Sequence, residues 1–220
     1  MTALISNLKL LFDAPRLLTR SEVLSRPSPV PRGPGIYAWY FDRAPPGVDT
    51  TGCHTVGERT LLYVGISPKA PPTNGRRPSS QNLRKRLRTH YGGNAEGSTL
   101  RLTLGCLLAE ELGIVLRRVG SGTRYTFTNP GECRLDDWMF RHALVTWIEA
   151  DRPWELEREI LASGLALPLN IHGREKTEAA LRLSAIRSES RRRANEMPIV
   201  TDSGGPRRLA IPPPDRVSRQ

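Results

Sequence analysis

The runs GIYAWYF at residues 35–41 and LLYVGI at residues 61–66 decide the fold class of this sequence. Both runs are rich in aromatic and β-branched residues, which are typical of β-strands. The loop over residues 42–60 joins them, so we expect two strands that lie as antiparallel neighbours. A third apolar run, LVTWI at residues 144–148, predicts another buried strand.

The segments between and after these strands carry helix signals. Ser80, Ser98 and Asp151 are candidate N-caps, because their side-chain oxygens accept hydrogen bonds from a first helical turn, and Gly113 is a candidate helix stop. A glycine-rich turn predicts a β-hairpin over residues 114–127. The expected helices cover residues 81–91, 98–112, 135–142, 154–163 and 175–195.

The chain carries a strong positive charge, with 33 Lys and Arg against 22 Asp and Glu and a formal net charge of +11 in 220 residues. Between Lys69 and Arg101 there are eight basic residues and one acid, Glu96, so the charge is concentrated. Such an excess favours a polyanionic partner, with nucleic acid ahead of a membrane surface. A solvated helix face with a soluble tail is the alternative, and composition alone does not separate the two.

Three cysteines, Cys53, Cys106 and Cys133, cannot all pair within one chain, and they show no Cys-x-x-Cys spacing. We therefore expect a reducing, cytoplasmic location. A zinc site made by Cys53, His54 and Cys133 is disfavoured, because the spacing differs from that of common structural sites. We find no segment apolar enough to span a membrane and expect a soluble protein.

One carboxylate lies on the apolar side of the helix expected over residues 154–163. At about 100° per residue, Glu157 falls in the middle of the apolar arc that its neighbours form. A carboxylate on the core side is costly unless a cation, a metal or a hydrogen-bond donor meets it, so Glu157 needs a partner. A structural ion pair with an arginine is the alternative to a functional role.

The basic helix expected over residues 81–91 has two different flanks. Arg86 and His90 lie four residues apart along one side of its apolar stripe, and Arg84 and Arg88 lie along the other. One flank is therefore available to a site while the other faces solvent. A basic row on a solvated helix is the alternative interpretation.

Five short elements occur along the chain: GIY at residues 35–37, YVG at residues 63–65, LRKRLRTH at residues 83–90, Glu157, and PLNI at residues 168–171. Each is a weak signal alone. In this order, the five resemble the motifs of the GIY-YIG endonuclease superfamily.

This resemblance implies an α/β fold with a small three-stranded antiparallel sheet flanked by helices. The chain then divides into a leader helix with a proline-rich linker (1–33), a nuclease-like domain (34–173), a basic helix (174–196) and a disordered Pro/Arg-rich basic tail (197–220). The inserted hairpin and the long loops over residues 42–60 and 67–80 are additions to a minimal member of the family.

The resemblance also implies an endonuclease that cuts DNA, with RNA left open, and that uses Mg²⁺ or Mn²⁺. The matched catalytic residues are Tyr37, Tyr63, Arg86, His90, Glu157 and Asn170. Glu157 matches the metal-binding glutamate, which suits Mg²⁺ because this ion keeps several waters. Arg86 would bind the phosphate, and Asn170 would hold the geometry. Tyr37 or Tyr63, aided by His90, would activate the attacking water, and the identity of the general base stays open.

Six basic residues are expected to bind the nucleic-acid backbone: Lys69, Arg76, Arg77, Arg84, Lys85 and Arg88. Those in the loop over residues 67–80 either track phosphates or belong to an unstructured connector. One site cuts one strand, so cutting both strands requires a homodimer or two visits. The rival interpretations are a catalytically inactive nucleic-acid-binding module of the same fold and a protein-interaction domain that meets an acidic protein.

Overall fold

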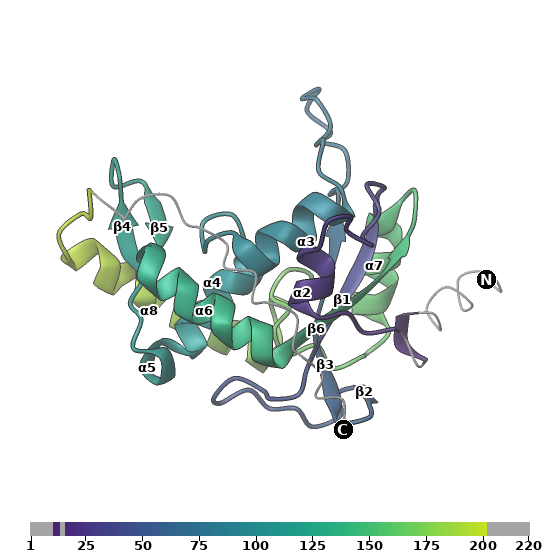
Figure 1. Cartoon of the computed structure of the whole chain (residues 1–220), viewed down its shortest axis with the longest axis horizontal. Coiled ribbons are helices and arrows are strands. Elements are labelled where there is room, and N and C mark those ends of the chain that lie inside the picture. The colour runs from purple at the N-terminus through teal and green to yellow at the C-terminus, as the bar shows by residue number, and fades with distance from the viewer. Residues whose placement is uncertain (1–10, 14–15, 202–220) are drawn as a thin grey trace, which may run out of the picture.

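The computed structural model describes residues 11–13 and 16–201 of the chain. Its centre is a four-stranded antiparallel sheet in the order β2-β3-β1-β6, seen near the middle of Figure 1. The strands are β1 (Gly35–Phe41), β2 (Thr55–Val56), β3 (Arg59–Ser67) and β6 (Ala143–Glu149). The three predicted strands are present, and a short fourth strand corrects the expected three-stranded sheet.

The additional strand comes from the loop expected over residues 42–60. β2 turns directly into β3 and pairs with it, with Val56 opposite Arg59. Gly57 has a φ of 58°, a conformation that glycine adopts without steric cost, and it allows this tight turn. A strand of two residues is too short to show a side-chain alternation, so its pattern was not visible in the sequence.

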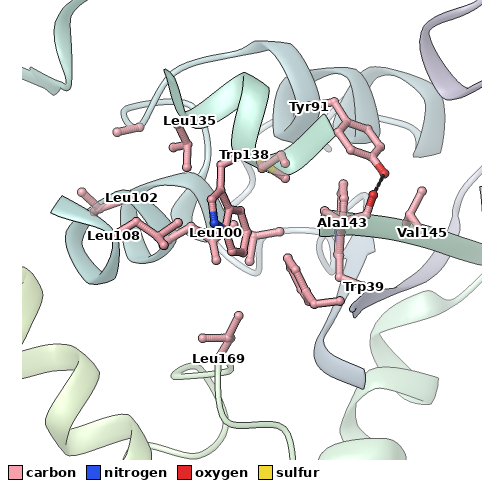
Figure 2. Packing of buried hydrophobic residues seen from close by; sticks show 14 of the residues in the cluster. Trp39, Tyr91, Leu100, Leu102, Leu108, Leu135, Trp138, Ala143, Val145 and Leu169 are labelled. Atoms are coloured by element: carbon pink, nitrogen blue, oxygen red, sulfur yellow. Dashed lines mark hydrogen bonds between the residues drawn. The ribbon is translucent and has the colours of Figure 1, made fainter. Parts of the chain in front are cut away.

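The central strand β1 is buried along its whole length and divides the core in two. Tyr37 and Trp39 belong to the larger hydrophobic cluster and Ile36 to the smaller one, as the two-residue period of a strand requires. Figure 2 shows the larger cluster, where the Tyr91 hydroxyl donates a hydrogen bond of 2.8 Å to the backbone oxygen of Ala143. This bond ties a helix to the start of β6.

Helices cover the two faces of the sheet unequally (Figure 1). On one face, α7 (Pro153–Ala162) covers the smaller cluster with Leu156 and Ile160. The other helices are α2 (Arg20–Leu24), α3 (Leu83–Gly92), α4 (Thr99–Leu107), α5 (Ala109–Leu112), α6 (Thr128–His142) and α8 (Glu178–Glu196). α8 packs on α4 and on the hairpin made by β4 (Arg117–Val119) and β5 (Arg124–Thr126).

The expected helices after the second strand are present, with shifted starts, and the one expected over residues 98–112 is divided at Leu108 into α4 and α5. The N-cap of α7 is Arg152 rather than Asp151. α3 is capped by Asn82 rather than Ser80, because the Asn82 side chain accepts a hydrogen bond of 2.9 Å from the first turn. α6 begins at Thr128 rather than at residue 135. The Glu132 carboxylate holds these extra turns, since it accepts hydrogen bonds from backbone N–H groups outside the helix.

From residue 16 on, the leader differs from the helix that its apolar spacing predicts, and residues 1–10 lie outside the described residues. Leu18 forms an antiparallel bridge with Val145 of β6, with hydrogen bonds of 2.9 and 3.0 Å. Helix α2 begins only after Thr19, which forms a capping box with Glu22. The cap therefore sets the start of the helix, and the preceding residues extend the sheet.

Residues 197–201 of the expected disordered tail are ordered. Val200 forms a parallel bridge to β4, and the Arg118 guanidinium donates a hydrogen bond of 3.2 Å to the backbone oxygen of Met197. These contacts hold the end of α8 against the hairpin. The rest of the tail, residues 202–220, lies outside the described residues.

Candidate active site

A cleft of about 940 Å³ lies along β3, with walls from β1, α3, α4, α7, α8 and the loop that follows α7. It brings together five of the six predicted catalytic residues: Tyr37, Tyr63, Arg86, Glu157 and Asn170. The sixth, His90, is fully buried and lies against Tyr37. Residues far apart in the sequence therefore meet at one site.

Hydrogen bonds connect three polar side chains at the floor of the cleft. The Tyr37 hydroxyl lies 2.8 Å from Nε2 of His90, and Nδ1 of His90 lies 2.7 Å from the Ser98 hydroxyl. Arg86 donates from Nε to the Tyr37 oxygen at 3.3 Å, and from Nη1 to the backbone oxygen of Gly97 at 3.0 Å. The flank of α3 that carries Arg86 and His90 thus faces the first motif tyrosine.

The glycines of the two strand motifs are steric requirements of this arrangement. Gly65 lies opposite Tyr37 in the sheet, and a Cβ atom at Gly65 would lie 2.6 Å from the Tyr37 hydroxyl oxygen. A Cβ atom at Gly35 would lie 2.3 Å from the backbone oxygen of Ile148. Any side chain at either position would displace the tyrosine or the neighbouring strand.

Glu157 is half-buried and faces the cleft, while Leu156 and Ile160 pack into the core. Among the residues that the structure describes, none lies within ion-pairing distance of its carboxylate. Burial raises the pKa of this carboxyl, and His172 and Lys69 oppose the shift. The structural ion pair that we considered is therefore not formed with any described arginine.

Asn170 is buried, and its side-chain amide is bonded to one residue of β3. Its Oδ1 accepts a hydrogen bond of 2.9 Å from the backbone N–H of Val64, and its Nδ2 donates one of 2.8 Å to the backbone oxygen of Val64. The backbone N–H of Leu169 donates to the backbone oxygen of Leu62 at 3.0 Å. Asn170 thereby fixes the loop after α7 along the YVG motif, and this loop forms one wall of the cleft.

Burial governs the protonation of the titratable groups on the cleft floor. It raises the pKa values of Tyr37 and Tyr63, while the positive charge of Arg86 acts in the opposite direction. It lowers the pKa of His90 well below its ordinary value, and the charges of Arg86 and Arg101 add to this effect. Both phenols are therefore protonated, and His90 is neutral, at neutral pH.

Two further residues of the cleft were not singled out from the sequence. Arg187 of α8 is half-buried, and burial together with repulsion from Arg191 lowers its pKa. His172 follows the asparagine loop and lies 3.4 Å from Glu175. In the sequence, Arg187 belongs to an arginine-rich helix end. Helical spacing alone does not show which of these arginines faces a site.

The six predicted nucleic-acid-binding residues have different surroundings. Lys69 lines the cleft. Exposed positions are occupied by Arg76, Arg77, Lys85 and Arg88. The loop with Arg76 and Arg77 projects from the molecule above α3 in Figure 1. Arg84 is half-buried and donates hydrogen bonds to the backbone oxygens of Ser28 and Val30, so it holds the proline-rich linker against α3.

Arg101, which we counted with the basic segment, is buried in an ionic network. Its Nη2 lies 2.6 Å from the Glu132 carboxylate, and its Nη1 lies 2.7 Å from the Asp136 carboxylate. Arg20 lies 3.5 Å from Asp136. Nη1 of Arg101 also donates a hydrogen bond of 3.1 Å to the backbone oxygen of His90. The exposed basic patch is therefore smaller than the sequence indicates.

All three cysteines are free thiols. The described residues contain no group of three or more His, Cys, Asp or Glu side chains arranged to bind a metal ion. Within the same part of the chain, no helix is both long and apolar enough to cross a membrane.

The family comparison covers the segments that form this cleft. The model of the GIY-YIG catalytic domain matches residues 35–189, which is more than half of the chain and includes most of α8. The chain therefore belongs to the GIY-YIG family of nuclease domains, as its motifs predict. No curated protein and no solved structure matches the sequence.

Proposed function

We propose that the chain is a divalent-metal-dependent endonuclease that hydrolyses phosphodiester bonds in DNA. The observation that carries this proposal is the meeting of Tyr37, Arg86 and Glu157, from three separate elements, around one cleft. Phosphodiester hydrolysis needs an activated water, neutralisation of charge on the phosphate and stabilisation of the leaving oxygen. The cleft offers a chemically suitable group for each of these tasks.

Glu157 is the residue that would hold the divalent cation, Mg²⁺ or Mn²⁺. Its carboxylate makes no ion pair with a described residue, and carboxylate oxygens are the ligands these hard ions prefer. A cation bound there would supply Lewis-acid stabilisation of the phosphate and of the leaving oxygen. The donor set present in the cleft therefore fits such an ion.

Arg86 is placed to bind the scissile phosphate. Its bonds to Tyr37 and Gly97 use Nε and Nη1 and fix the plane of the guanidinium. Nη2 takes part in neither of these two bonds, and Tyr63 is a further hydrogen-bonding neighbour of the guanidinium in the cleft. A permanently charged donor held in a fixed position stabilises charge on the phosphate without reorganisation in the transition state.

Tyr37 and Tyr63 are the groups that would position the attacking water, and the one that first loses its phenolic proton to solvent would accept the proton of that water. Tyr37 has two nitrogen atoms beside its oxygen, Nε of Arg86 at 3.3 Å and Nε2 of His90 at 2.8 Å. Tyr63 is half-buried in the same cleft. Separate replacement of each tyrosine by phenylalanine identifies the base, because only one loss removes the pH dependence of the hydrolysis.

Basic residues outside the cleft floor would hold the DNA backbone. Lys69 at the cleft, Arg76 and Arg77 in the projecting loop, and Lys85 and Arg88 on α3 are all exposed. We leave Arg84 out of the proposed interface, because Nε and Nη2 of its guanidinium donate hydrogen bonds to the linker backbone. Contacts of this kind make the affinity fall steeply as salt rises.

The three free thiols support a cytoplasmic setting, since a reducing compartment keeps such cysteines unpaired. A single catalytic site of this kind would nick one strand in each encounter. A homodimer is the arrangement that would let the protein cut both strands in a single binding event, and the length of the product distinguishes the two modes.

The test is cleavage of supercoiled plasmid and of branched DNA by the wild type and by Glu157→Gln, with magnesium, manganese or EDTA. We expect metal-dependent cutting by the wild type and none by Glu157→Gln, with DNA binding retained. Glu159→Gln is the matched control, because it makes the same change at an exposed position of the same helix. DNA binding without cutting in every condition would favour the inactive binding module, and weak binding at physiological salt would favour a protein partner.

A further inference from the structure

We propose that Ser98 is a positioning residue that fixes the tautomer of His90 and so directs the proton of the Tyr37 hydroxyl into the cleft. Ser98 is the N-cap of α4, His90 lies in the last turns of α3, and Tyr37 lies on β1. The sequence assigned Ser98 a helix cap and nothing else. The hydrogen bonds around it give the residue a second task.

The Ser98 hydroxyl is fully buried and has two polar neighbours among the described residues. The backbone N–H of Arg101 donates to its oxygen at 3.1 Å, which is the capping bond. Nδ1 of His90, at 2.7 Å, is therefore the one acceptor available to the Ser98 proton among these residues. A proton on Nδ1 would leave the serine proton buried without an acceptor, which is unfavourable. Ser98 must donate to Nδ1.

The proton of neutral His90 is then on Nε2. This nitrogen lies 2.8 Å from the Tyr37 oxygen and donates to it. Nε of Arg86 donates to the same oxygen at 3.3 Å. The Tyr37 oxygen thus accepts two hydrogen bonds, and its own proton cannot point at His90. Because Tyr37 lines the cleft, that proton is directed into it.

The assignment gives His90 and Tyr37 different tasks, and this consequence rests on the proposed nuclease function. His90 cannot accept the Tyr37 proton, because Nε2 is already protonated. Tyr37 is the group that faces the substrate, and a phenolate formed there, after its proton passes to solvent in the cleft, would keep both N–H donors. Ser98 and His90 therefore orient Tyr37, because the hydrogen bond that Nδ1 accepts makes Nε2 the donor to the Tyr37 oxygen.

The direct test is ¹⁵N NMR of the histidine ring nitrogens in the full-length chain near neutral pH. The His90 signals are assigned as those missing from the spectrum of His90→Gln. We expect an unprotonated Nδ1 and a protonated Nε2. A protonated Nδ1, or an averaged mixture of the two tautomers, overturns the proposal. This measurement needs neither DNA nor a metal, so it stands apart from the success or failure of the nuclease assignment.

The role of Ser98 is isolated by Ser98→Gly, because glycine is tolerated at an N-cap but has no hydroxyl. We expect Ser98→Gly to lose the single His90 tautomer and to cleave DNA about tenfold more slowly, as one positioning hydrogen bond is lost. Ser98→Thr keeps a hydroxyl and should restore both. Thr177→Ala, which removes the N-cap hydroxyl of α8, should leave the His90 signals unchanged. An unchanged His90 tautomer in Ser98→Gly overturns the proposal, and if that variant does not fold, the wild-type spectrum alone decides.

Discussion

Two clusters of charge lie on either side of His90, and they differ in how completely their members are paired. Behind the histidine, Arg101 is fully buried, and all three of its nitrogen atoms make hydrogen bonds. On the cleft side, Arg86 donates through Nε and Nη1 to Tyr37 and Gly97 and has Tyr63 as a further neighbour, and Glu157 has no ion pair with any described residue. Both clusters contain arginine and carboxylate side chains, but only on the cleft side does the carboxylate lack an ion pair with a described residue.

The degree of pairing distinguishes charged side chains that stabilise the fold from those that are available to bind a ligand. A buried charge whose hydrogen-bonding capacity is filled has nothing left for a substrate, and its loss leaves its partners unpaired. A half-buried charge that lacks partners lowers the stability of the folded state. Such groups are found where they have a functional role. We therefore propose that Arg101 serves the stability of the fold, whereas Arg86, Glu157 and Arg187 serve the site.

The largest effect is expected from Arg101→Met. The substitution leaves the Glu132 and Asp136 carboxylates with less compensation in a buried setting, so we expect a loss of about 3–5 kcal/mol in the free energy of unfolding. Denaturant titration measures it. Arg88→Met, at an exposed position of α3, is the control and should change the unfolding free energy by less than about 0.5 kcal/mol. A change in Arg101→Met no larger than in the control would break the comparison.

Arg86→Met should behave in the opposite way. We expect DNA cleavage to fall about 10²–10³-fold, because a fixed donor to the developing phosphate charge is lost. The free energy of unfolding should change by no more than about 1–1.5 kcal/mol, the value of an ordinary hydrogen bond. Single-turnover cleavage and denaturant titration on the same preparation give both numbers. Equal loss of stability and activity would show that Arg86 is structural.

Arg187→Ala sharpens the comparison within one helix. Arg187 lines the cleft, whereas Arg193 is ion-paired to Glu189 at 2.7 Å. We expect kcat/KM to fall about tenfold in Arg187→Ala, since an open cation near a phosphate contributes on the order of 1–2 kcal/mol. Arg193→Ala should have no measurable effect on cleavage. Similar losses in the two variants would mean that α8 contributes only general positive charge.

The smallest effect concerns pH and the stability of the folded chain. Burial raises the pKa of Glu157 above its ordinary value of 4.5, so the folded state disfavours the charged form. Glu157→Gln should therefore be slightly more stable than the wild type above the folded pKa. The difference should shrink as pH falls and vanish below about 4.5, where the carboxyl is protonated in both states. Unfolding curves of both proteins across this range test the sign, and a gain that grows at low pH would contradict it.

The strands and the motif residues could be predicted from the sequence because their signals are local. The apolar run at residues 35–41 and the spacing of Arg86 and His90 on one flank of a helix need no knowledge of distant contacts. The position of Glu157 on α7 was also readable. Its place on the apolar side of the helix could not show that a cleft, rather than packed core, adjoins that side.

The features that could not be predicted depend on distant partners. Arg101 follows a basic segment in sequence, yet its acidic partners lie more than thirty residues away on α6. Arg187 reaches the cleft only because α8 packs on α4. The leader pairs with β6 through Leu18, a contact that no local period reports. In each case tertiary contacts, rather than local pattern, determine the surroundings of the side chain.

The double hydrogen bond between the Asn170 amide and Val64 has a consequence for how the molecules behave toward one another. β2 is only two residues long, so beyond it the backbone groups of Val64 would be an open sheet edge, which can recruit a strand from another molecule. The Asn170 amide is hydrogen-bonded to both of these groups, and a side chain cannot pair with another strand as an edge strand does. The residue matched to the catalytic set of the family would therefore also disfavour self-association of the chain through this edge of its sheet.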